Sequence, residues 1–177
     1  MSAKQQDIPY GSWPSPITAR FITSTGVGLG DLQVDEAGEL YWLEGRPQEA
    51  GRRAVVRHAP KEAGASERGA VDVTPADVNV RTRVHEYGGG DYTLAEGGSV
   101  IYSDFKSQRL FQKHPDREPL ALTPPSASFP DGRYRFADGV VDAARARYVC
   151  VREDHGPDGQ ASPADVVNEI VSVALDG

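Results

Sequence analysis

One stretch of ten residues concentrates side chains that could do acid–base or binding chemistry. Residues 81–90 read R-T-R-V-H-E-Y-G-G-G, so two arginines, a histidine, a glutamate and a tyrosine precede three consecutive glycines. A histidine beside a glutamate could transfer a proton, and the charged groups could hold the end of a peptide through charge-assisted hydrogen bonds. Consecutive glycines cost backbone entropy and are kept where the chain needs a positive φ or a close approach. The stretch therefore predicts a functional or corner-forming loop.

The candidate substrate-contacting or interface residues of this stretch are Arg81, Arg83, His85, Glu86 and Tyr87. If His85 and Glu86 lie in a strand, their side chains point to opposite faces and cannot meet at one substrate atom without a bulge. The three glycines could supply such a bend. Two interpretations stay open. The preferred one is that the motif holds neighbouring sheets together, and the other is that it meets a catalytic domain or a substrate.

A second charged cluster, R-E-D-H, ends an apolar run and precedes a G-P-D-G turn. Its candidate contact residues are Arg152, Glu153 and His155, which could bind a peptide terminus. The alternative is a solvated strand end with local ion pairs. Glu44 and Arg46 in W-L-E-G-R are a similar but weaker case.

The elements that must position these side chains are short β-strands. With 19 glycines and 13 prolines the chain is rich in turns, and short strand-like runs bounded by Gly, Pro, Asp or Asn recur in three groups. The expected strands are residues 31–35, 39–44, 53–59 and 71–75, then 91–96, 99–105, 109–114 and 120–124, then 136–142, 147–154 and 168–176. V-D-V-T-P closes the first group and L-A-L-T-P closes the second, which indicates an internal repeat.

Repeats of four strands over about 40–50 residues are typical of β-propeller blades. The predicted fold is all-β. It is a partial β-propeller with about two complete four-stranded blades and most of a third: after an N-terminal segment, 1–30, the blades are about 31–75, 91–124 and the incomplete 136–177. A propeller needs at least four blades, so we expect a fragment of a longer protein, a truncated gene model or a split protein. The open edge at residues 168–176 predicts self-association.

Composition excludes several classes of partner. A formal net charge of −7 over 177 residues disfavours nucleic acid and anionic membranes as partners. No membrane-spanning run or secretion signal is visible, which predicts a cytoplasmic protein. The single cysteine, Cys150, excludes an internal disulfide and is expected in the core, and the four histidines lack metal-ligand spacing. Because G-V-G-L-G also lacks a nucleotide-binding context, neither a metal nor a cofactor is predicted.

Several motifs, in order along the chain, resemble the start of the prolyl oligopeptidase family of serine peptidases, of the acylaminoacyl peptidase or dipeptidyl aminopeptidase type. They are Y-G-S-W-P-S-P-I-T (10–18), W-L-E-G-R-P (42–47), R-T-R-V-H-E-Y-G-G-G (81–90), Y-S-D-F (102–105), Q-R-L (108–110), A-D-G (137–139) and V-R-E-D-H (151–155). The resemblance implies a β-propeller that admits only short peptides to an α/β-hydrolase domain, which is the expected partner. That domain would carry the catalytic serine, aspartate and histidine.

Three functions remain open. The preferred one is the substrate-gating propeller fragment of a serine exopeptidase that acts on short or N-acylated peptides. The sequence contains no G-x-S-x-G, so no triad residue is assigned and the chain alone is predicted to be inactive. The second is a stand-alone propeller-like binding module that is completed by oligomerisation. The third is a propeller enzyme such as a metal-dependent lactonase, which requires an axial cluster of carboxylate and asparagine ligands that the sequence does not display.

Overall fold

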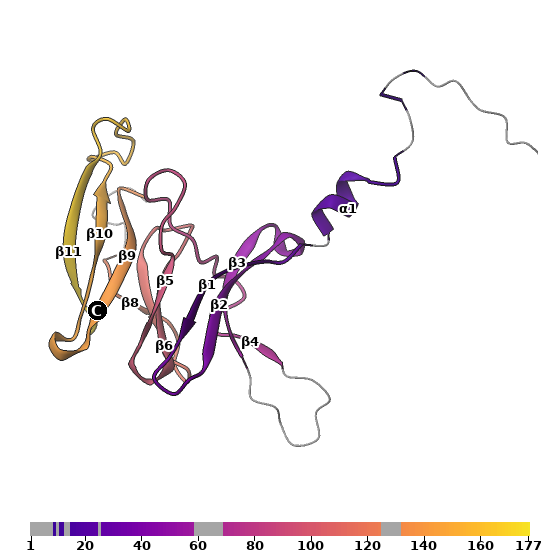
Figure 1. Cartoon of the computed structure of the whole chain (residues 1–177). Coiled ribbons are helices and arrows are strands. Elements are labelled where there is room, and N and C mark those ends of the chain that lie inside the picture. Colours follow the sequence, from indigo (N-terminus) through magenta and orange to yellow (C-terminus); the bar gives the residue numbers. More distant parts are fainter. Residues whose placement is uncertain (1–8, 10, 13–14, 25, 59–68, 125–131) are drawn as a thin grey trace, which may run out of the picture.

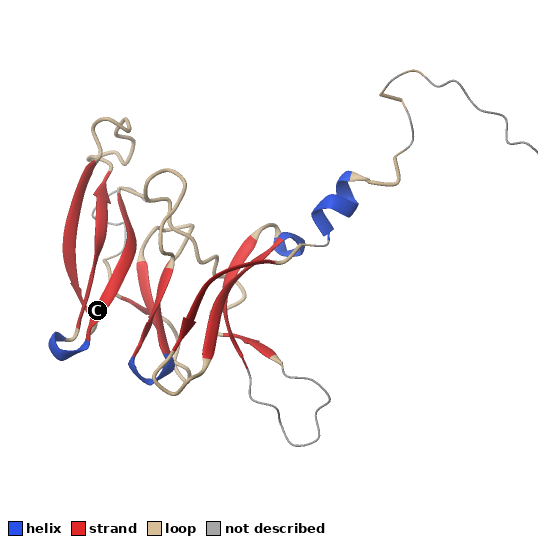
Figure 2. Ribbon diagram, in the orientation of Figure 1, coloured by secondary structure: helices blue, strands red, loops and turns tan. Residues whose placement is uncertain are grey.

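The regular secondary structure in the described part of the chain is almost entirely β. The computed structural model describes residues 9, 11–12, 15–24, 26–58, 69–124 and 132–177. Within these ranges eleven strands form three antiparallel sheets, which stand side by side (Figures 1 and 2). One α-helix is present among the described residues, α1 (Ala19–Ser24), and it lies beyond the first sheet (Figure 1). No helix in the described part of the chain is long and apolar enough to cross a membrane.

Each sheet follows chain order, as expected when short turns join antiparallel neighbours. The first sheet consists of β1 (Gly28–Val34), β2 (Leu40–Arg46), β3 (Arg52–His58) and β4 (Ala70–Asp72). The second consists of β5 (Tyr92–Ala95), β6 (Ser99–Ser103), β7 (Leu110–Lys113) and β8 (Leu120–Ala121). The third consists of β9 (Tyr134–Asp142), β10 (Arg147–Asp154) and β11 (Val167–Ala174). The single-turn 3-10 helices η1 (Pro47–Glu49), η2 (Glu96–Gly98) and η4 (Ala143–Arg145) lie in the turns after β2, β5 and β9.

The grouping of strands predicted from the sequence is confirmed. Ala59, expected to end the third strand, lies outside the described residues. Two predictions were too long, because β4 and β8 each end three residues before the expected Pro75 and Pro124.

The repeated T-P motif explains why β4 and β8 are short. The N–H of Val55 donates to the Thr74 hydroxyl at 3.2 Å, and the N–H of Leu110 donates to the Thr123 hydroxyl at 3.1 Å. The residue that follows each threonine is a proline, which has no N–H for a ladder and restricts the residue before it. In both sheets a buried hydroxyl therefore replaces the carbonyl that a longer strand would have offered.

Two apolar cores lie between the sheets. Val100 and Tyr102 of β6 pack with Tyr41 and Leu43 of the first sheet. Ile101 lies between them in sequence and packs on the opposite side in a second cluster, whose buried members are Ile101, Leu110, Leu122, Phe136, Tyr148 and Cys150. This is the alternation of side chains along a strand, and it leaves every residue of β6 buried. The second sheet is thus covered on both faces.

Cys150 is a core residue, as the sequence predicted. Its side chain is buried and unpaired, and burial raises the pKa of the thiol to about 12. A thiol with such a pKa is not a nucleophile at neutral pH.

Polar contacts also join the first strands of the three sheets. The Tyr92 hydroxyl on β5 donates to the Asp31 carbonyl on β1 at 2.6 Å, and the Thr93 hydroxyl donates to the Gly139 carbonyl on β9 at 3.0 Å. The Gln33 side chain of β1 bonds the backbone of β5 twice, at the Tyr92 carbonyl and the Leu94 N–H. Strands β1, β5 and β9 are therefore neighbours, although each belongs to a different sheet.

Gly139 on β9 lies directly against the Tyr148 ring on β10. A Cβ at this position would lie 1.9 Å from Cζ of Tyr148, whose ring packs across the glycine. We predict that Gly139→Ala lowers the free energy of unfolding by about 1–3 kcal/mol, because the Tyr148 ring must leave its site in the core. Urea denaturation measures this loss.

Gly28→Ala is the matched control, since its Cβ would meet no atom within 4 Å. It should leave stability unchanged or raise it slightly. Equal unfolding midpoints for the two variants would contradict the packing argument.

Candidate functional site

Residues 81–90 form a turn that leads from the first sheet to the second, and we call them the crossing loop. Val80 bridges to Asp104 just before the loop, and the Gly88 N–H donates to the Val84 carbonyl at 2.8 Å. His85 and Glu86 both have positive φ, at 57° and 65°. The loop that the sequence predicts here is confirmed, and His85 and Glu86 lie in its turn, in the left-handed region, instead of alternating along a strand.

The backbone of the crossing loop is held by the third sheet. The His85 N–H donates to the Glu153 carboxylate at 2.8 Å, and the Arg135 guanidinium donates to the Arg83 carbonyl at 3.0 Å. The Gly90 N–H donates to the Asp138 carboxylate at 2.6 Å. A segment that connects the first two sheets is therefore anchored to the third.

The last two glycines of the motif have a packing role. A Cβ on Gly89 would lie 2.7 Å from the Asp138 carboxylate, and a Cβ on Gly90 would lie 3.0 Å from it. Asp138 itself has a positive φ of 55° and donates its N–H to the Gly90 carbonyl at 3.2 Å. Only residues without a side chain allow the two segments to approach this closely. These contacts support the architectural interpretation of the glycines.

The two charged clusters predicted from the sequence meet at Glu153. One carboxylate oxygen lies 3.4 Å from Nδ1 of His85, and the other lies 2.9 Å from Nε2 of His155. Glu153 and His155 are both buried, whereas His85 reaches the surface. The paired acid of His85 is thus Glu153, from a strand 68 residues away, and not its sequence neighbour Glu86.

Three side chains at the tip of the crossing loop reach solvent. The side chains of His85 and Glu86 are 42% and 65% exposed, and Tyr87 is 86% exposed. Glu86 pairs with Arg135 at 3.2 Å, while the His85 and Tyr87 rings lie 6.3 Å apart. The loop therefore offers a cation-capable ring, an anion and an aromatic surface on a fixed backbone, but no activated nucleophile.

The arginines of this region have different environments. Arg152 pairs with Glu169 and lies over the Tyr134 ring, with its guanidinium carbon 4.6 Å from the ring centre. Arg81 and Arg83 both lie over Phe105, at 5.2 and 5.4 Å from its ring centre. Burial and the nearby Arg135 lower the pKa of Arg83.

Four residues that help to organise the crossing loop were not singled out as candidates in the sequence, whereas Glu153 was. They are Phe105, Gln108, Arg135 and Asp138. Three of them stand in the short motifs Y-S-D-F, Q-R-L and A-D-G that carried the family resemblance. These motifs, far apart in sequence, converge on the crossing loop, so the resemblance contained a signal for them. Arg135 had none.

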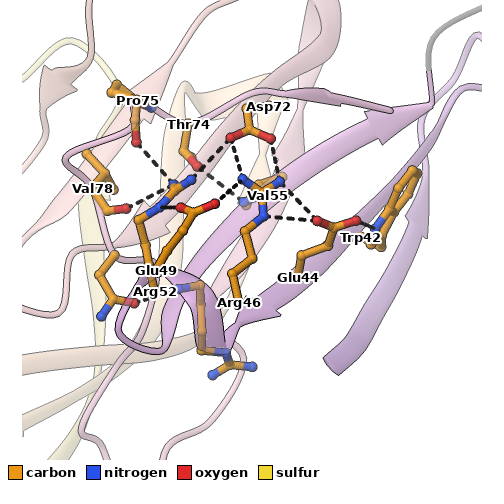
Figure 3. A network of polar contacts seen from close by, with 12 residues as sticks. Trp42, Glu44, Arg46, Glu49, Arg52, Val55, Asp72, Thr74, Pro75 and Val78 are labelled. Atoms are coloured by element: carbon orange, nitrogen blue, oxygen red, sulfur yellow. Dashed lines mark hydrogen bonds and ion pairs between the residues drawn. The ribbon is translucent and has the colours of Figure 1, made fainter. Parts of the chain in front are cut away.

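Glu44 and Arg46 belong to a separate network on the first sheet (Figure 3). The Arg46 guanidinium donates to both oxygens of Asp72, at 2.7 and 2.5 Å, and also pairs with Glu44 at 2.9 Å. Arg52 joins Asp72 to Glu49. Each charge in this network has a partner within the same sheet, which favours a role in holding β2, β3 and β4 together.

The structure is similar to parts of solved peptidases. A puromycin-hydrolyzing peptidase from Mycobacterium tuberculosis matches at 35% identity and a TM-score of 0.71, over 97% of this chain and 25% of that chain. Two crystal structures of puromycin hydrolase, one of a mutant complexed with PGG, match at 34% and 32% identity with TM-scores of 0.73, over 96% of this chain and 25% of theirs. The chain thus spans about a quarter of the length of these proteins. Neither a comparison with protein-family models nor one with curated proteins gave a match.

We predict that Glu153→Ala loosens the crossing loop. The substitution leaves the buried His155 ring and the His85 N–H without their acceptor, which costs about 1–3 kcal/mol of unfolding free energy. Amide hydrogen exchange at His85 should accelerate in the same variant.

Glu169→Ala is the control, because its carboxylate pairs with Arg152 at the surface. It should change stability by less than about 1 kcal/mol and leave His85 exchange unchanged. An unaltered His85 amide in Glu153→Ala would show that Glu153 does not hold the loop.

The ion pairs of the Asp72 carboxylate should stabilise the fold at neutral pH and lose this effect in acid. Its hydrogen bonds from Arg46 and Arg52 hold its pKa below the ordinary aspartate range. A carboxylate whose pKa is lowered by folding stabilises the fold at pH values above its unfolded-state pKa of about 3.9. This contribution is lost as the pH falls through the pKa of the folded state. Asp72→Asn should therefore lower the unfolding free energy at pH 7 by about 1 kcal/mol or less, since the site is partly exposed.

The difference between Asp72→Asn and the parent chain should shrink as the pH falls below about 4. Denaturation series at pH 7, 4 and 2.5 measure it, with exposed Asp116→Asn as the matched control. A difference that stays constant down to pH 2.5 would rule out the ion pair as its source.

Proposed function

We propose that this chain, which belongs to the N-terminal β-propeller region of the prolyl oligopeptidase family of serine peptidases, forms part of the cap over a peptidase active site. The observation that carries this proposal is the similarity at 32–35% identity over 96–97% of the chain, against 25% of the matched peptidases. An identity at this level over nearly the whole chain supports a shared role for the segment and not only a shared fold.

In this proposal the three sheets are propeller blades. The two four-stranded sheets are complete blades at about 31–75 and 91–124, and the three-stranded sheet belongs to a further blade at about 136–177. Three features support it: chain-order antiparallel sheets, apolar cores between successive sheets, and first strands that neighbour one another. The first blade begins with β1 at Gly28, so the segment that precedes it ends three residues before the expected residue 30.

The proposed role of this cap is to select substrates. A propeller placed over an α/β-hydrolase domain admits short peptides and excludes folded chains. We propose short or N-acylated peptides as substrates, in line with an exopeptidase of the acylaminoacyl or dipeptidyl aminopeptidase type. The catalytic serine, aspartate and histidine would come from the hydrolase domain, because the printed sequence has no G-x-S-x-G elbow. The unpaired thiol of Cys150 is compatible with a reducing, cytoplasmic setting.

The candidate contacts to substrate or to the hydrolase domain are the side chains of the crossing loop and of the end of β10. His85, Glu86 and Tyr87 are the strongest, because they reach solvent while their backbone is fixed. Glu153 and His155 are buried and would act by holding the loop. Arg152 would act at the surface beside Glu169.

A stand-alone binding module is the second candidate, and exposed apolar side chains favour it. Leu29 on β1 and Ile170 on β11 are 72% and 73% exposed, one at each end of the row of sheets. Such side chains on terminal sheets favour association with another sheet, either from the same protein or from a second copy.

The length and activity of the native product test the proposal. We expect antibodies against residues 81–90 to detect a species about four times as long as this chain, since the chain covers 25% of its relatives. This species should hydrolyse acyl-amino acid or dipeptide p-nitroanilides, and a serine-directed phosphonate should abolish the activity. The 177-residue chain alone should show no hydrolysis.

A folded native species of 19.1 kDa would instead favour the binding module. Phosphonate-sensitive hydrolysis by the 177-residue chain itself would overturn the proposal that the chemistry lies outside it.

A further inference from the structure

Arg81 and Arg83 share one aromatic ring. Their guanidinium carbons lie 5.2 and 5.4 Å from the centre of the Phe105 ring, so both cations sit against the same side chain. Like charges repel, and stacking on an aromatic ring contributes only about 0.5–1 kcal/mol at a site near the surface. An arrangement of this kind becomes favourable when an anion lies between or beside the two cations.

A buried glutamine fixes the backbone of both arginines. Gln108 is 1% exposed, and its side-chain oxygen accepts the Arg83 N–H at 2.8 Å. Its amide nitrogen donates to the Arg81 carbonyl at 3.3 Å and to the Phe105 carbonyl at 2.9 Å. One side chain therefore fixes the backbone that carries the two arginines and Phe105 before any ligand arrives, which lowers the entropy cost of binding.

Three neighbouring arginines have a carboxylate within ion-pair distance, whereas in the described part of the chain Arg81 and Arg83 have only the more distant charges of Asp91 and Glu86. Arg133 pairs with Asp154, Arg135 with Glu86 and Arg152 with Glu169. Among the described residues, no carboxylate lies within ion-pair distance of Arg81 or Arg83. The Nε atom of Arg83 is buried and has no hydrogen-bond acceptor among the described residues, as is also true of Nε of Arg135 and Arg152. Arg83 differs from those two in having no ion pair there, and burial lowers its pKa because it disfavours the charged form.

We propose that Arg81 and Arg83 form a carboxylate-binding site, with Phe105 against both side chains and Gln108 as its support. Guanidinium groups bind carboxylates with two parallel hydrogen bonds, and a stacked guanidinium keeps its edge free to do so. A singly charged ligand is favoured over a phosphate, because the formal charge of −7 repels multiply charged anions.

The ligand that fits this site is the free carboxyl end of a short peptide. This assignment rests on the proposed function, in which short peptides reach the crossing loop. Arg81 and Arg83 stand in the same loop as the exposed His85, Glu86 and Tyr87. A peptide held at its carboxyl end by the arginines would extend past side chains that differ in charge and in aromatic character.

The test uses the 177-residue chain with triglycine and triglycinamide as probes. Chemical shifts of the arginine Nε–Hε groups and of the Phe105 ring report binding at low salt. We expect triglycine to bind and triglycinamide not to bind. Arg83→Gln should weaken triglycine binding about tenfold, the change expected for losing a hydrogen bond to a charged group. Arg83→Lys should recover part of it, because the charge remains.

Arg145→Gln is the control, since Arg145 lies in the turn between β9 and β10 and pairs with Asp142. It should bind triglycine as the parent chain does. Equal binding of the acid and the amide, or unchanged binding by Arg83→Gln, would overturn the site. Inorganic phosphate that displaces triglycine at equal concentration would reduce the site to a general anion patch and overturn the carboxylate assignment.

A further arm uses the longer native product. If the 177-residue chain binds triglycine but the longer product does not, the arginines are occupied by an acidic side chain of the remaining protein, and the peptide assignment is wrong. This outcome is independent of hydrolysis, which tests the proposed function separately.

Discussion

The second sheet is apolar on both faces, and a sheet of this size can bury each face only against another sheet. Val100 and Tyr102 face one neighbour and Ile101 faces the other, all of them buried. Burying a large apolar side chain contributes about 1.5–3 kcal/mol, so neither interface can be given up without loss of much of the stability. The row of three sheets follows from this requirement. The segments that connect the sheets must then run along their ends.

A connecting segment carries backbone groups that need partners, and the crossing loop obtains them from side chains of distant elements. Glu153, Asp138 and Gln108 each accept one of its N–H groups. These bonds allow His85 and Glu86 to keep a positive φ, which side chains disfavour. The same bonds fix the backbone that carries the exposed side chains of the loop. The architectural interpretation of the loop is therefore compatible with the proposed recognition role, because the anchoring contacts use its backbone and leave the exposed side chains at its tip accessible.

The arginines of the Figure 3 network and of the crossing loop fall into two groups, those that form ion pairs and those that lie over an aromatic ring without one. In the network of Figure 3, Arg46 and Arg52 neutralise acids of their own sheet, so the charges there hold strands together. Around the crossing loop, Arg135 neutralises the Glu86 carboxylate and also donates a hydrogen bond to the Arg83 carbonyl. Arg81 and Arg83 lie over Phe105 and form no ion pair within the described residues.

The sequence by itself determined the strands, their grouping and the place of the T-P motifs, because alternation and turn residues act over a few positions. It also identified the crossing loop and the apolar surroundings of Cys150. It could not show that His85 pairs with Glu153, 68 residues away, or that Gln108 supports Arg83 across 25 residues. Nor could it show that Gly90 meets Asp138. Only the tertiary structure decided these contacts, because they arise where one sheet stacks on the next, and the periodicity of a strand does not encode which side chains of another sheet will face it.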